Sequence, residues 1–141
     1  MKSVALIIFL LTLFSCGGDD SKTNAVISFE TIRFCTQTGA NSVCESSRNQ
    51  IAEGTTRIYS STGVNFNTTA ASFTFNWYLV NDSGCRTSLS NDAVVPEVSG
   101  EQVLTGFYMN TGGLEKGLYE LEITFNAAET SESTVAQFSV N

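Results

Sequence analysis

Apolar and polar residues alternate with a period of two along most of the chain, and this pattern is typical of half-buried β-strands. The clearest predicted strand covers 72–80, where one face carries large apolar side chains: Phe73, Phe75, Trp77 and Leu79. A second clear strand starts at Gly117 and places the following residues on one face: Tyr119, Leu121, Ile123 and Phe125. In both strands the other face is mostly polar or carries residues that can face solvent, such as Thr74, Glu120 and Glu122.

Four further segments are predicted as strands, and they span 25–34, 57–62, 102–109 and 135–140. In the first, Ile27 and Phe29 fall on one face and Ile32 and Phe34 on the other, so a bulge or a change of sheet is expected near Glu30.

The intervening segments lack this alternation. Residues 35–53 are polar and form a long loop that needs a local tie, and 81–84 has the composition of a tight turn. No window carries a helical stripe. The prediction is therefore an all-β fold, a single antiparallel β-sandwich of six to eight strands.

Two motifs resemble the immunoglobulin-like fold. Trp77 stands in the middle of a strand, and Gly117-Leu118-Tyr119 opens a late strand after a loop. The resemblance implies that the Tyr119 hydroxyl bonds back to nearby backbone as a corner tyrosine. The segments around Tyr59, Trp77, Tyr119 and Phe138 also resemble small exported bacterial β domains, over residues 55–141. No Cys follows two residues after Tyr119, so the antibody disulfide is absent. Such sandwiches host many functions.

The N-terminus has the build of an export signal. Residues 1–15 contain Lys2 and then an apolar run too short to span a bilayer, which fits a cleavable signal peptide. Leu13-Phe14-Ser15-Cys16 resembles the bacterial lipobox, and this resemblance implies that Cys16 carries the lipid. Residues 16–24 would be a flexible tether and 25–141 the folded domain. Gly17 is not the Asp that retains enteric lipoproteins at the inner membrane, so we expect an outer-membrane anchor, in either leaflet.

Charge and composition exclude several functions. The chain has 7 basic and 14 acidic residues, a net charge of −7, which disfavours nucleic acid as a partner. The absence of His excludes Ser-His-Asp and Cys-His catalysis and His-containing metal sites. The acidic loops at 91–101 and 129–132 lack EF-hand spacing. Neither a metal nor a cofactor is predicted.

Cysteines and aromatic residues supply the remaining candidates. With Cys16 lipidated, a Cys35–Cys44 disulfide is favoured because it would tie the long loop, and pairing of Cys85 with either one is the alternative. Trp77 and Phe107 are expected in the core. Tyr78 and Val80 face the opposite way and are the candidate surface binding residues.

Three functions agree with these features. The first is a non-enzymatic binding module on the outer membrane, with a protein or glycan partner, which requires an exposed aromatic or apolar patch. The second is a structural accessory subunit of an envelope assembly, which requires an uncovered edge strand. The third, which we do not favour, is a hydrolase with two carboxylates converging in a concave site.

Overall fold

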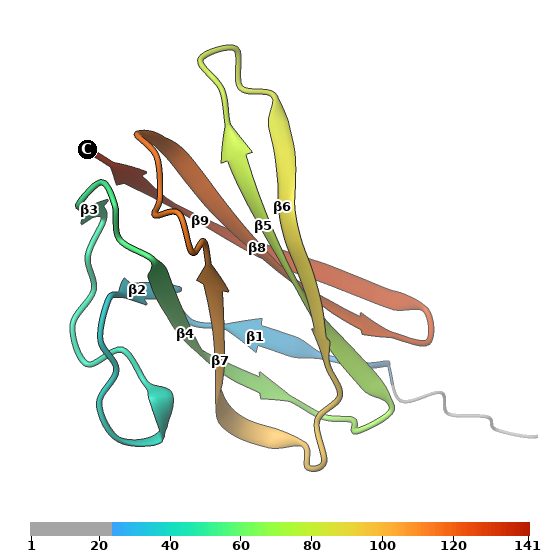
Figure 1. Cartoon of the computed structure of the whole chain (residues 1–141). Helices are drawn as coiled ribbons and strands as arrows, with labels where there is room; N and C mark the ends of the chain where they lie inside the picture. The colour runs from blue at the N-terminus through green and yellow to red at the C-terminus, as the bar shows by residue number, and fades with distance from the viewer. Residues whose placement is uncertain (1–23) are drawn as a thin grey trace, which may run out of the picture.

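The computed structural model describes residues 24–141, and these form two packed β-sheets (Figure 1). Sheet A has β4 (Arg57–Phe66) at its centre, with β1 (Ile27–Phe29) and β2 (Arg33–Cys35) along one side and β7 (Gly100–Met109) along the other. Sheet B has the order β3 (Gln50–Ile51), β9 (Thr130–Val140), β8 (Gly117–Ala127), β5 (Ala71–Val80) and β6 (Arg86–Val94). The predicted all-β sandwich is confirmed.

Two details differ from the expected sandwich. The very short β3 pairs parallel with β9, so sheet B is mixed rather than purely antiparallel. Within residues 24–141, counting the two- and three-residue strands gives nine strands, and a short 3-10 turn lies at Ala40–Ser42. The predicted signal peptide, most of the tether and Cys16 lie outside the described residues.

The core lies between the two sheets. Strands β5 and β8 of sheet B form one wall, and strands β1, β2 and β4 of sheet A form the other. The alternation in the sequence is realised directly, since Phe73, Phe75 and Trp77 on β5 are at most 2% exposed. On β8, Tyr119 is buried and Leu121, Ile123 and Phe125 are completely so. Burying each such side chain contributes about 1.5–3 kcal/mol.

The phase slip in the first predicted strand is a bulge. Phe29 lies opposite Val64, and Arg33 lies opposite Ser61. Between these two pairs the chain from β1 to β2 moves on by four residues, whereas β4 moves on by three. The extra residue lets Ile27, Ile32 and Phe34 all be buried against the core. Both halves stay on β4, so no change of sheet is needed.

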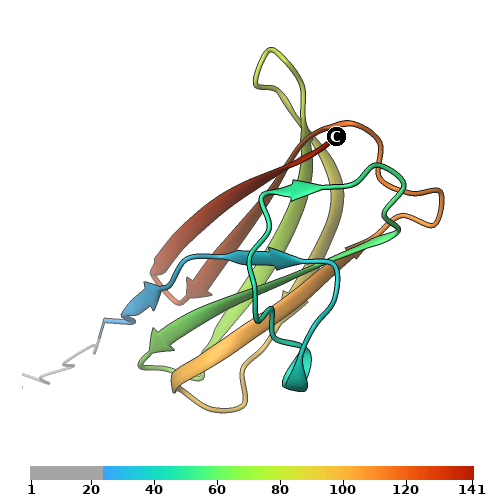
Figure 2. The same cartoon turned by 90° about the vertical axis from the view of Figure 1, so that its left-hand side faces the viewer.

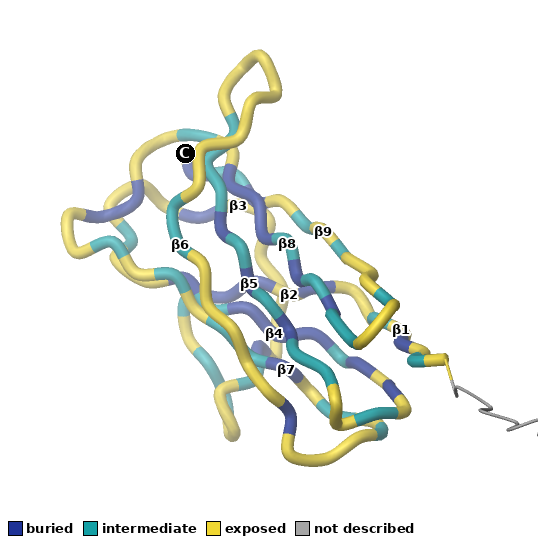
Figure 3. Tube along the Cα trace, turned by 90° about the vertical axis from the view of Figure 1, so that its right-hand side faces the viewer, coloured by how far each residue is buried: buried dark blue, intermediate teal, exposed yellow. Residues whose placement is uncertain are grey.

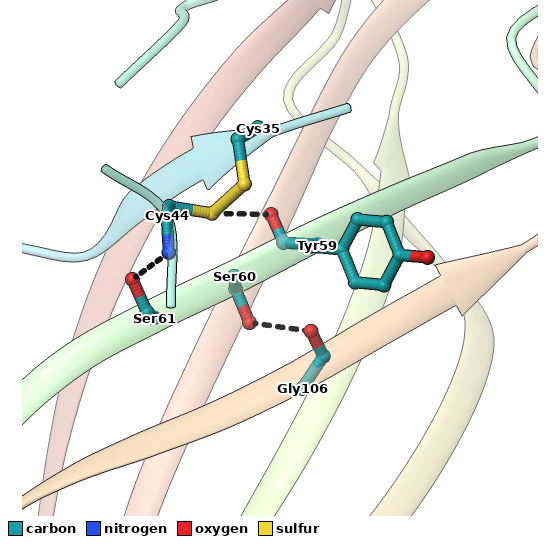
Figure 4. Close-up of a disulfide and its surroundings, with 6 residues drawn as sticks. All are labelled: Cys35, Cys44, Tyr59, Ser60, Ser61 and Gly106. Carbon is teal, nitrogen blue, oxygen red and sulfur yellow. Dashed lines mark hydrogen bonds between the residues drawn. A yellow bond between two sulfur atoms is a disulfide. The ribbon is translucent and has the colours of Figure 1, made fainter. Parts of the chain in front are cut away.

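Two local ties follow the sequence expectations. Cys35 and Cys44 form a disulfide, which leaves Cys85 free and exposed and settles the choice among the alternative pairings. Figure 4 shows the disulfide lying against β4, where the Cys44 amide donates to the Ser61 hydroxyl at 3.1 Å. The Tyr119 hydroxyl donates to the Glu115 carbonyl at 3.0 Å, as a corner tyrosine does.

No strand is predicted from the sequence over 86–94, where the structure has β6. Its nine residues are exposed or half-buried throughout, and they include four hydroxyl or amide side chains and two charged ones. An edge strand with so little apolar surface has no period-two signal to detect. Among residues 24–141, no helix is long and apolar enough to cross a membrane.

Candidate interaction surface

Exposed apolar side chains gather on the outer face of sheet A along β7. Val103, Phe107 and Met109 are 51%, 52% and 48% exposed. On β4, Arg57 stands beside Met109 and Tyr59 beside Phe107, whereas Val103 is opposite Gly63. We call Arg57, Tyr59, Val103, Phe107 and Met109 the β7 platform. Large apolar groups together at a surface are typical of interaction sites.

The platform arises from the alternation of β7. Leu104 and Tyr108 point into the sandwich, and Tyr108 stacks on Trp77 with ring centroids 6.0 Å apart. The odd-numbered residues must then point outward. The expectation that Phe107 packs in the core is therefore wrong, whereas the same expectation for Trp77 is confirmed, since Trp77 is 1% exposed. In a strand reading Val-Leu-Thr-Gly-Phe-Tyr-Met, both faces are apolar enough to be the buried one.

Arg57 is held by aromatic and sulfur contacts. Its guanidinium carbon lies 5.2 Å from the centre of the Phe107 ring and 5.9 Å from that of Tyr59. It also donates to the Tyr59 hydroxyl at 3.3 Å and to Met109 Sδ at 3.2 Å. Within the described chain, Arg57 forms no ion pair with a carboxylate. Its charge is thus positioned but not neutralised, on a strongly acidic protein.

A shallow hollow adjoins the platform at this end of the sheet. It measures about 500 Å³ and is lined by Thr36, Gly54, Thr55, Thr56, Arg57, Tyr59 and Met109. Three threonines, one arginine and one tyrosine give it a rim of hydrogen-bonding groups. The surface therefore combines an apolar, aromatic centre with a polar edge, which is the usual anatomy of a protein interface.

The predicted surface residues Tyr78 and Val80 lie elsewhere, on the outer face of sheet B, and both are half-buried. Arg86 covers the Tyr78 ring at 5.0 Å, and the Tyr78 hydroxyl donates to Glu122 at 3.4 Å. Partial burial and the Glu122 carboxylate raise the pKa of Tyr78 above its ordinary value. The structure thus gives Tyr78 partners within its own chain, and it does not bring Tyr78 or Val80 to the β7 platform.

The same face of sheet B carries an ionic cluster. Arg86 pairs with Glu120, and its other terminal nitrogen lies 3.6 Å from Glu122. Gln137 donates to Glu120 at 2.7 Å. Glu120 is only 5% exposed, so these contacts offset the cost of burying its charge. The cluster connects β6, β8 and β9 across the sheet.

Two glutamates border a hollow of about 440 Å³ on the outer face of sheet A. They are Glu30 and Glu101, and the Glu30 side chain lies over Gly63. Both carboxylates are exposed, so neither sits in the apolar pocket that a general acid requires. Among the described residues, no group of three or more His, Cys, Asp or Glu is arranged to hold a metal ion.

No protein-family model matches the chain, and no curated protein matches it at a significant level. One solved structure that is similar is the crystal structure of the Parabacteroides merdae β-glucuronidase, with a TM-score of 0.49 and 16% identity. That alignment covers 81% of this chain and 14% of the other.

Proposed function

We propose that this protein is a non-enzymatic interaction module that a lipid on Cys16 holds at the outer membrane, and that the β7 platform contacts its partner. The observation that carries the proposal is the platform itself. It presents Phe107, Tyr59 and Arg57 together, and aromatic residues and arginine are the types enriched where binding energy concentrates.

The position of the platform supports a tethered module. The chain enters the domain at Asn24, and Ile27 on β1 pairs with Phe66 at the far end of β4 from Arg57 (Figure 2). Ten residues of β4 separate the two ends, which is about 30 Å at ~3.3 Å per residue. A domain anchored through its N-terminus would hold the Arg57 end of the platform away from the membrane.

Site-specific photo-cross-linking in cells of the source organism tests this function. A photoreactive phenylalanine replaces Phe107, and a matched variant carries it at Val135. Val135 is a suitable control because it is 45% exposed and lies on β9 in the other sheet. We expect a discrete adduct with a second macromolecule from position 107 and none from 135. Equal adducts from both positions, or none from 107, would contradict the proposal.

The free edge of β7 favours a second candidate, an accessory subunit of an envelope assembly. Strand β7 pairs only with β4, so its other side has no neighbouring strand among the described residues. An uncovered edge is a template for a strand from another chain. The two candidates share one surface, and the second adds backbone pairing along the β7 edge to the side-chain contacts of the platform.

A further inference from the structure

The open edge of β7 presents a regular row of backbone groups. The Asn110 amide donates to the Thr56 carbonyl, which continues the β4–β7 register past Arg57 and Met109. In an antiparallel pair, hydrogen bonding alternates along the strand. The even-numbered residues of β7 therefore bond to β4. The N–H and C=O groups of Val103, Thr105 and Phe107 point to the open edge, and their side chains lie on the outer face.

The two free edges on this side of the sandwich differ in how they are protected. Strand β6 carries the inward-pointing charge of Asp92, and its pairing with β5 is interrupted between Trp77 and Tyr78. Inward charges and bulges are devices that prevent unwanted strand pairing. Strand β7 has neither. Its register with β4 is unbroken over ten residues, and 102–109 contains no charged residue and no proline.

Sheet B also extends one strand beyond sheet A here. Strand β7 packs over β5, since Tyr108 stacks on Trp77 and Gly106 lies against the Phe75 ring. Ser90, Asp92 and Val94 of β6 pair with inward-facing residues of β5, yet Asp92 is exposed and Val94 is 41% exposed. Figure 3 shows β6 exposed or half-buried along its length. Sheet A therefore leaves Asp92 and Val94 on the inner face of β6 uncovered, whereas the Ser90 hydroxyl oxygen is buried. We call this uncovered strip of β6 together with the open edge of β7 the notch.

We propose that this notch takes an extended segment of a partner protein, which adds to β7 as a further strand of sheet A. Alternate side chains of the segment would lie on the outer face beside the platform. Apolar ones suit positions beside Val103 and Phe107, and an acidic one suits the position beside Met109, where the Arg57 charge is unneutralised. This inference rests on the proposed function, because it names how the platform is used.

A second copy of the chain fits the notch poorly. Two copies joined by their β7 edges would be related by a two-fold axis between the strands. Because sheet B overhangs by one strand in each copy, the β6 of one copy would enter the layer that β5 and β6 of the other occupy. A single strand from another protein meets no such obstacle.

Selection from a displayed library of random ten-residue peptides against the purified full-length protein tests the inference. We expect enriched peptides with alternating apolar residues and an acidic residue near one end. Thr105→Pro removes the central edge donor while leaving the bonds to β4, because proline is tolerated where its nitrogen faces the open edge. It should weaken binding of the selected peptides about tenfold or more, and Arg57→Glu should weaken the acidic ones by a similar factor.

Amide hydrogen exchange of the wild-type protein provides a readout that does not depend on folding of the proline variant. A selected peptide should slow exchange at Val103, Thr105 and Phe107. Peptides that bind equally well to Thr105→Pro but are lost in Phe107→Ser would overturn strand addition while leaving the platform as a binding site. Self-association of the protein through β7 would also overturn the inference. Peptides whose binding neither substitution changes would overturn both the inference and the proposed function.

Discussion

Tyr119 shows how one hydroxyl can fix the entry of a strand. It bonds to the Glu115 carbonyl, four residues upstream, while its ring stacks on Phe138 with centroids 5.3 Å apart. The loop before β8 is therefore tied to the core by Tyr119, the residue for which the Gly117-Leu118-Tyr119 motif predicted this role. The motif could be recognised because both partners are close in sequence and the bond needs no knowledge of the rest of the fold.

Replacing Tyr119 by Phe should lower the free energy of unfolding by about 1 kcal/mol, the usual contribution of a hydrogen bond of this kind. Burial raises the pKa of Tyr119 above its ordinary value of 10.0. The folded protein therefore keeps this proton more tightly than the unfolded chain, and the resulting stability is lost as pH rises above about 10. Urea titrations at pH 7 and above pH 10 should show that Tyr119→Phe weakens the alkaline loss. An unchanged midpoint at pH 7 would refute the role of the bond.

The Arg86–Glu120 pair has a different balance. Arg86→Ala would leave Glu120 buried without its cation, which we expect to lower the free energy of unfolding by about 1–3 kcal/mol. The double variant Arg86→Leu/Glu120→Leu should lose less than Arg86→Ala, because it removes the buried charge as well. Denaturant unfolding of the three proteins measures this order, and a double variant less stable than the single one would contradict it.

Among the strands, those with one completely buried face could be predicted from the sequence. Strands β5 and β8 have uninterrupted alternation. The slip between Phe29 and Ile32 predicted a bulge or a change of sheet, and the structure has the bulge. Strand β6 could not be found, because an exposed edge strand does not need apolar side chains.

The pattern of apolar residues does not show which face of β7 is buried. The strand itself was predicted, but its buried face was not, since apolar residues occupy both sides. The choice between Phe107 and Tyr108 depends on Trp77 and Phe75 in the opposite sheet, which are distant in sequence. The platform was missed for this reason, and two-sided apolar character of an edge strand is the signal that could have found it.

The disulfide stabilises the long connection between β2 and β4. Cys35 and Cys44 are nine residues apart, and in the chain-entropy model closing such a loop contributes about 2–3 kcal/mol. Cys35→Ala/Cys44→Ala should lower the free energy of unfolding by that amount. Cys85→Ala, at an exposed free cysteine, is the matched control and should leave it unchanged. Equal effects of the two changes in chemical denaturation would rule out a specific contribution of the bridge.

In the molecule as a whole, β1 lies at one end of the sandwich, and Arg57, Met109 and the polar hollow lie at the other. This arrangement suits a domain that is tethered through its N-terminal segment.

Cys16→Ala should abolish incorporation of a palmitate analogue and release the protein from the membrane fraction. Wild-type protein that is unlabelled and soluble would contradict the lipid anchor. Protease added to intact cells then decides the leaflet, since cleavage without lysis would place the domain outside the cell.

If the β7 platform binds a partner in the cell, that partner covers the outer face of sheet A at β7. Hydrogen exchange measured by mass spectrometry, on purified protein and on membranes of the source organism, shows whether this claim holds. Exchange over 100–109 should be slower in the membranes, while exchange over 130–140 in sheet B should be the same in both. Equal exchange rates over 100–109 in the two samples would show that β7 is uncovered in its native setting and would contradict the claim.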